Sequence, residues 1–99
     1  MKVNIQAVNF NVDRKLVDFI NERLTKLEKF YDKVVSFEVF LKLENSSDRE
    51  NKTVDLKVLV PGDDVVVKKT CKTFEEAADL CADAVERMLV KRKEKLKSY

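Results

Sequence analysis

Alternation of apolar and polar residues over four runs is the strongest constraint on the fold of this chain. The runs cover residues 1–8, 33–44, 52–60 and 64–72. Successive side chains of a strand point to opposite faces of its sheet, so each run predicts a strand with one apolar face and one polar face. Such strands form a sheet that is covered on one side only.

Two stretches with helical spacing supply that cover. Residues 14–31 follow Asp13, a candidate N-cap, and residues 73–99 open with Thr73 and Glu76 in the capping-box pattern. Each stretch carries one apolar stripe: Leu16, Ile20, Leu24, Leu27 and Tyr31, widened by Phe19 and Phe30, in the first, and Phe74, Ala77, Ala78, Cys81, Ala84, Val85, Met88 and Leu89 in the second. Both helices therefore pack on the apolar face of the sheet.

The predicted order is β-α-β-β-β-α, an α/β chain of the α+β type. We expect a four-stranded mixed sheet with two helices on one face, in a single domain over residues 1–99. The first helix makes a right-handed crossover between two parallel strands, and the other strands form an antiparallel meander. Residues 45–51 form a hairpin loop, and Pro61-Gly62 fits a type II turn.

Alternation also assigns side chains to the covered face. We expect the second strand to bury Val35, Phe37, Val39, Leu41 and Leu43, and the last strand to turn Val65, Val67, Lys69 and Cys71 inward. An inward lysine is unusual in a central strand, but on an edge strand it discourages pairing with another sheet.

The composition leaves little for catalysis or metal binding. The chain has no histidine and one glycine, so it lacks the commonest general base, the commonest metal ligand and a glycine-rich phosphate loop. Cys71 and Cys81 stand ten apart and read as small core residues. We predict no enzyme, no catalytic or metal site, no cofactor and no small-molecule substrate. No long apolar stretch or signal peptide is evident, which predicts a cytoplasmic protein without membrane contact.

Charge is balanced overall but segregated along the chain. Lysine and arginine number 20 and aspartate and glutamate 18, so binding to an anion depends on where the charges lie. Arg87, Lys91 and Lys95 recur every fourth residue, in a row about 12 Å long. Arg23, Lys26 and Lys29 follow the edge of the first helix. If the two rows face each other across a shallow groove, they suit the phosphate ridges of a structured RNA.

A second interpretation of the same charges stays open. The second helix begins with acids and ends with bases, which is what the helix macrodipole favours. Glu22 and Lys26 are spaced as an i, i+4 pair on a solvated face. In that case the charges only compensate the dipole and keep the chain soluble.

The helical segments resemble the ribosome hibernation-promoting factor family, which includes the ribosome-associated inhibitor often called protein Y. Residues 23–29 match a segment like RL-x-KLEK, and residues 84–95 match one like KLERQLxKxKxK. Between them the chain has the family's aromatic residue, paired alanines and aspartate: Phe74, Ala77, Ala78 and Asp79. Ala84 and Met88 depart from a common lysine and a common glutamine.

The resemblance implies a ribosome-binding protein. Members bind the small ribosomal subunit, within the 70S ribosome, in the channel for messenger RNA and transfer RNA, where they inhibit translation and preserve idle ribosomes under stress or in stationary phase. Their basic helix residues contact the ribosomal RNA backbone, so by position the RNA-binding residues here are Arg23, Lys26, Lys29, Arg87, Lys91, Arg92 and Lys95. Because the chain ends at Tyr99, we expect the short form of the family.

Two other functions remain as alternatives. The outward sheet face carries Phe40, Leu59 and Val66, which suits a protein-interaction or assembly domain. A general double-stranded RNA-binding domain shares the mixed α/β format and the basic helix. Preference for ribosomes over naked duplex RNA discriminates between the last reading and a hibernation factor.

Overall fold

The computed structural model describes residues 2–8, 10–44 and 51–97, and only the backbone of residues 63 and 94–97. Its elements follow the predicted order and are, in sequence, β1 (Lys2–Val8), α1 (Arg14–Phe30), β2 (Ser36–Leu43), β3 (Lys52–Val60), β4 (Asp63–Cys71) and α2 (Phe74–Lys97). The α+β fold predicted from the alternation is therefore confirmed. The predicted hairpin loop lies almost wholly at residues 45–50, outside the described residues.

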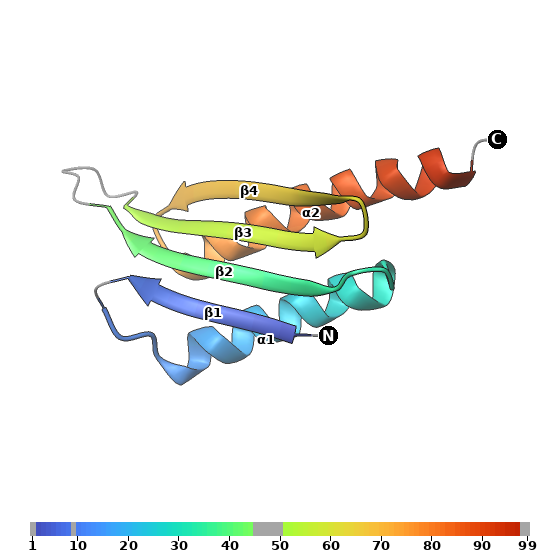
Figure 1. The fold of residues 1–99 in the computed structure, drawn as a ribbon. Helices are drawn as coiled ribbons and strands as arrows, with labels where there is room; N and C mark the ends of the chain where they lie inside the picture. The colour runs from blue at the N-terminus through green and yellow to red at the C-terminus, as the bar shows by residue number, and fades with distance from the viewer. Residues whose placement is uncertain (1, 9, 45–50, 98–99) are drawn as a thin grey trace.

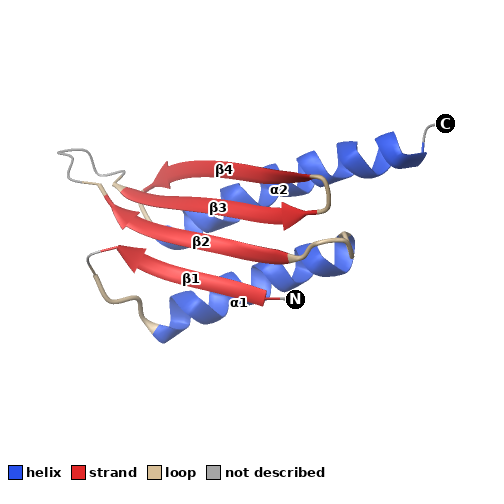
Figure 2. Cartoon of the chain, in the orientation of Figure 1, coloured by secondary structure: helices blue, strands red, loops and turns tan. Residues whose placement is uncertain are grey.

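The four strands form one mixed sheet in the order β1-β2-β3-β4. β1 and β2 pair in parallel, and β2, β3 and β4 pair as an antiparallel meander. Both helices lie behind the sheet in the view of Figure 1, and Figure 2 separates the strand layer from the helix layer by colour. α1 packs beside α2, and α2 packs over β3 and β4.

Side-chain caps fix where the helices begin. Asp13 Oδ1 accepts a hydrogen bond of 2.8 Å from the Leu16 amide, and Thr73 Oγ1 accepts one of 3.1 Å from the Glu76 amide. Each bond satisfies a backbone donor that the first helical turn leaves open. Gly62 has a φ of +88°, which a residue with a Cβ adopts only at a cost, so this glycine allows the tight β3–β4 turn.

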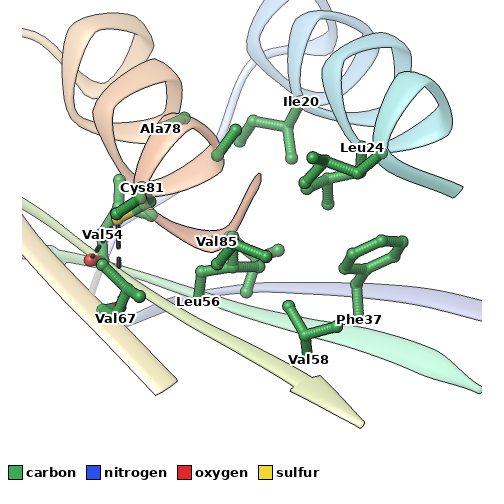
Figure 3. Close-up of a cluster of buried hydrophobic side chains, with 14 of the residues drawn as sticks. Ile20, Leu24, Phe37, Val54, Leu56, Val58, Val67, Ala78, Cys81 and Val85 are labelled. Atoms are coloured by element: carbon green, nitrogen blue, oxygen red, sulfur yellow. Dashed lines mark hydrogen bonds between the residues drawn. The ribbon is translucent and has the colours of Figure 1, made fainter. Parts of the chain in front are cut away.

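The core lies between the helices and the covered face of the sheet (Figure 3). Leu24 from α1 and Val85 from α2 meet the strand residues Phe37, Leu56 and Val58, and all of these are at most 2% exposed. The inner face of β3 is buried at Val54, Leu56, Val58 and Val60, because strand alternation holds over its full length.

Cys81 of α2 sits over the middle of the sheet. Its thiol donates to the carbonyl oxygens of Val54 at 3.4 Å and Val67 at 3.9 Å, as the dashed lines of Figure 3 mark. Burial raises the pKa of this thiol to about 11. A buried, protonated thiol is a poor nucleophile, which agrees with its reading as a small core residue.

The inward sets predicted for the second and last strands were too long. Val35 and Leu43 are 59% and 48% exposed, because the alternation continues past the part of the sheet that the helices cover. Val34 is buried in place of Val35. Lys69 also differs: it is exposed, since β4 is an edge strand and the long side chain reaches solvent.

Two stripe residues of the helices are also more exposed than predicted. Phe19 of α1 and Met88 of α2 are 36% and 45% exposed. Each lies at the margin of its stripe, where the neighbouring helix or the sheet no longer covers it.

Candidate nucleic-acid interface

The two helices run side by side in the same direction. β4 runs parallel to β1, since one parallel and two antiparallel pairings connect them, and each helix returns from the end of one of these strands. Figure 1 shows both helices starting at the same end of the sheet, with α2 continuing past the β3–β4 turn. The basic C-terminal halves of α1 and α2 therefore share one end of the molecule.

Arg23, the first residue of the predicted basic row, is bound to α2. Its Nε donates to Asp79 Oδ1 at 2.9 Å and its Nη2 to Asp83 Oδ1 at 2.7 Å. Burial alone lowers the pKa of Arg23, but the hydrogen bonds that it donates to Asp79 and Asp83 outweigh this effect, and the pKa ends above its ordinary value. This guanidinium joins the two helices.

That contact identifies the side of α2 that faces α1. At 100° per residue, Arg87 lies about 80° and Lys91 about 120° around the helix from Asp79. These two cations therefore point to solvent and toward the β4 side, away from α1. The predicted groove with facing basic rows is wrong for them, because the rotation of α2 was not readable from its sequence.

Lys93 occupies the position that was expected for the second row. Its Nζ lies 5.0 Å from the ring centroid of Phe30 and donates to the Phe30 carbonyl at 3.3 Å. The ammonium thus stacks on an aromatic face and meets a carbonyl at the C-terminal end of α1, where the helix dipole favours a cation. Lys93 joins the helices at their basic end, as Arg23 does near the middle of α1.

The cations that remain form what we call the basic surface: Lys26, Lys29, Arg87 and Lys91. All four side chains are exposed, and within residues 2–8, 10–44 and 51–97 none of them makes an ion pair or a side-chain hydrogen bond. The predicted Glu22–Lys26 pair is likewise missing from the ion pairs of this part of the chain. The basic surface lies on the solvent side of the helix layer, over its C-terminal half.

Two predicted residues lie beside the basic surface. Arg92 is half-buried, and its Nη2 donates to the Pro61 carbonyl at 3.5 Å, across the β3–β4 turn. Lys95 belongs to the last turns of α2, and its side chain lies outside the described residues.

The sequence reasoning missed the partners of Arg23 and Lys93. Asp79 and Asp83 stand at i, i+4 beside the apolar stripe, and this spacing was the available signal for a shared cation. Lys93 gave a weaker signal, since it stands six residues before Tyr99 on the face that continues Asp79 and Asp83.

The described residues contain little else that binds or reacts. No group of three or more His, Cys, Asp or Glu side chains in this part of the chain is placed to hold a metal ion. Among the described helices, none is long and apolar enough to cross a bilayer.

Comparisons with known proteins agree on one family. A family model described as "Sigma 54 modulation protein / S30EA ribosomal protein" matches residues 3–97. The ribosome hibernation promoting factor of Pseudomonas putida is 32% identical over 98 residues, which cover 99% of this chain and 92% of that protein. The protein of that name from Escherichia coli K12 is 28% identical over 99 residues, the whole of both chains.

Solved structures share the fold. A ribosomal subunit interface protein from Coxiella burnetii superposes with a TM-score of 0.83 at 17% identity, over 95% of this chain and 99% of that one. The N-terminal domain of Thermus thermophilus Protein Y gives 0.75 at 20% identity, over 89% and 94%. At these identities the likeness concerns the arrangement of helices and strands alone.

Proposed function

The chain belongs to the Sigma 54 modulation protein / S30EA ribosomal protein family, and on this premise we propose that it is a ribosome hibernation factor. It binds ribosomal RNA of the small subunit in the channel for messenger RNA and transfer RNA. Occupancy of that channel inhibits translation and preserves idle 70S ribosomes under stress or in stationary phase. The names of the relatives from P. putida and E. coli support this proposal.

The observation that carries the RNA contact is the basic surface. Lys26, Lys29, Arg87 and Lys91 have exposed charges without an anionic partner among the described residues, so they bind phosphates without first breaking contacts in the fold. Each phosphate they neutralise releases condensed counterions, and affinity falls as salt rises. Arg92 and Lys95 extend the surface along α2. Arg23 is the one member of the predicted set whose charge is already bound by two aspartates.

The same proposal covers location and chemistry. A ribosome-bound factor works in the cytoplasm, as one domain over residues 1–99, without a cofactor or a catalytic step. The exposed cations on the two helices suit a role in which the protein occupies a site and excludes other ligands. Nothing in that role requires a bond to be made or broken.

Co-sedimentation with purified 30S subunits and 70S ribosomes, across a salt titration, tests the proposal. Naked duplex RNA serves as competitor. We expect saturable binding near one copy per small subunit, which high salt removes and duplex RNA does not. A cell-free translation assay with added protein then measures inhibition, which should follow occupancy.

Two results would count against the proposal. If the protein binds neither 30S subunits nor 70S ribosomes, the proposal is wrong. Binding that any duplex RNA displaces equally well points to a general double-stranded RNA-binding domain, because such a domain reads the shape of the duplex and has no preference for the ribosome.

A further inference from the structure

The edge strand β4 has a charge pattern that is complementary to itself. Its first seven residues are Asp63-Asp64-Val65-Val66-Val67-Lys68-Lys69, two acids and two bases around three valines. β4 is the last strand of the sheet and pairs with β3 on one side only, so its other edge presents open backbone donors and acceptors in the described part of the chain (Figure 1).

We propose that two copies of this chain pair through β4, antiparallel and centred on Val66, to form a dimer with one continuous eight-stranded sheet. In this register Val66 lies opposite Val66 of the second copy, and Val65 lies opposite Val67. Asp64 lies opposite Lys68 on the outer face, and the two-fold axis creates that pair twice.

The free charge of Lys68 is suited to this pairing. Within its own sheet Lys68 lies opposite Asp55, but Asp55 is bound to Lys42 at 3.0 Å, and Lys68 makes no ion pair with a described residue. Asp64 lies 3.7 Å from Lys57. A carboxylate has acceptor sites for more than one cation, so Asp64 keeps Lys57 and adds Lys68 of the second copy.

Other registers are unfavourable. If one strand slides by one residue, Asp64 and Lys68 come to lie opposite residues whose side chains point to the other face of the sheet. If it slides by two residues, each charge lies opposite a valine or another uncharged residue. A parallel arrangement puts like charges side by side. Charge at this edge therefore discourages most edge contacts, but it admits the one register in which Asp64 lies opposite Lys68 of the second copy.

The helix layer fits the same two-fold axis. The Cys81 thiol reaches the Val67 carbonyl, so the axis at Val66 passes within about one turn of Leu80. Leu80 and Ala84 lie about 100° and 140° around α2 from Asp79, on the flank that faces away from α1, and Leu80 is 42% exposed. Leu80 is therefore an apolar side chain on the flank nearest the second copy.

Strand spacing brings the two α2 helices to packing distance. α2 lies over β3 and β4, and its mate lies over the matching strands of the second copy. With strands about 4.8 Å apart, two helices centred over these strand pairs stand about 10 Å apart, which is the upper end of normal helix packing. They run antiparallel, so the two basic surfaces lie at opposite ends of the dimer and stay open.

The other edge of the sheet lacks this pattern. β1 has the sequence Lys2-Val3-Asn4-Ile5-Gln6-Ala7-Val8, with a single charge and no acid to complement it. Self-pairing through β1 would set Lys2 opposite an uncharged residue. The two edges therefore provide a matched comparison within one molecule.

Light scattering with size exclusion, or sedimentation equilibrium, tests the dimer with two charge reversals. Lys68→Asp leaves only acids at positions 64 and 68, and Asp64→Lys leaves only lysines. Each variant alone should self-associate at least about tenfold more weakly than the wild type, because every mutated pair becomes repulsive on both sides of the axis. Mixed in equal amounts, the two variants should form a heterodimer, since acids then meet lysines again.

Lys2→Asp is the control, with the same charge change at the β1 edge and no expected effect on mass. Thermal melting of all variants checks that they are folded. A wild-type chain that stays monomeric at its highest soluble concentration overturns the proposal. A wild-type dimer that keeps its mass in both reversed variants, or variants that fail to combine on mixing, places the interface elsewhere and overturns it as well.

Discussion

Two regions of the helix layer use the same residue types for different purposes. Where the middle of α1 meets the first turns of α2, Arg23 is held by Asp79 and Asp83. At the C-terminal end, Lys26 and Arg87 have no anionic partner among the described residues. A cation that is bound inside the chain stabilises the fold, whereas one that has only solvent around it is available to a ligand. Spacing along the helix does not separate these two cases.

The difference also explains why net charge says little about this protein. Asp79 and Asp83 of α2 bind Arg23, whereas the four cations of the basic surface have no ion-pair partner among the described residues. A chain with a net charge of +2 thus carries a local basic surface. Substitutions at the paired and the unpaired cations test whether these residues have separate roles.

Leu24→Asp should unfold the chain. Leu24 follows Arg23 directly but is 2% exposed in the shared core, and an unpaired buried carboxylate there costs roughly 3–5 kcal/mol in addition to the lost packing. That is most of the stability of a small domain. Circular dichroism with urea denaturation measures it. Thr25→Asp is the matched control on the exposed side of α1 and should stay folded; equal stability of the two variants would contradict the position of the core.

Lys26→Glu combined with Lys91→Glu should weaken ribosome binding about 100-fold or more and leave the fold intact. Both side chains are exposed, so only the phosphate contacts change. The salt dependence of binding should flatten by about one unit for each residue. Co-sedimentation across salt measures both effects.

The matched control for this pair is Lys15→Glu with Lys72→Glu, which makes the same change of charge in the first turn of α1 and just before α2. It should bind within a few-fold of the wild type. Wild-type binding by the Lys26 and Lys91 variant, or an equal loss in the control, would mean that the unpaired end is not the binding surface.

Arg23→Gln should lower the free energy of unfolding by about 1 kcal/mol, because it removes two ion pairs whose aspartates are about half exposed. The salt dependence of ribosome binding should stay unchanged. A double-mutant cycle with Asp79→Asn isolates the coupling between the helices. If the salt slope instead falls by about one unit, Arg23 contacts RNA, as its place in the basic row first indicated.

Lys93→Gln should have the smallest effect, a loss of about 0.5 kcal/mol in stability. The variant loses the contact with the Phe30 ring and keeps a polar side chain in an exposed position. The urea midpoint measures this. Lys91→Gln, two residues away and without such a contact, should leave the midpoint where it is; an equal shift in both would show that the Phe30 contact contributes nothing.

Much of the site was predictable from local pattern. Lys26 and Lys91 were placed on exposed helix faces because each lies off the apolar stripe of its helix, and both are exposed. Arg23 and Lys93 were harder, since their roles depend on the neighbouring helix. Val35 was assigned to the core because alternation shows which face a residue takes but not where the helices stop covering that face.

The sequence by itself determined the elements, their order and the one-sided cover of the sheet. These follow from spacings of two and of 3.6 residues and from caps such as Asp13 and Thr73, all of which act within a few residues. The rotation of α2 was decided only in the tertiary structure. It depends on packing between residues that lie 56 and 60 positions apart, where Arg23 meets Asp79 and Asp83, and no local pattern contains that distance.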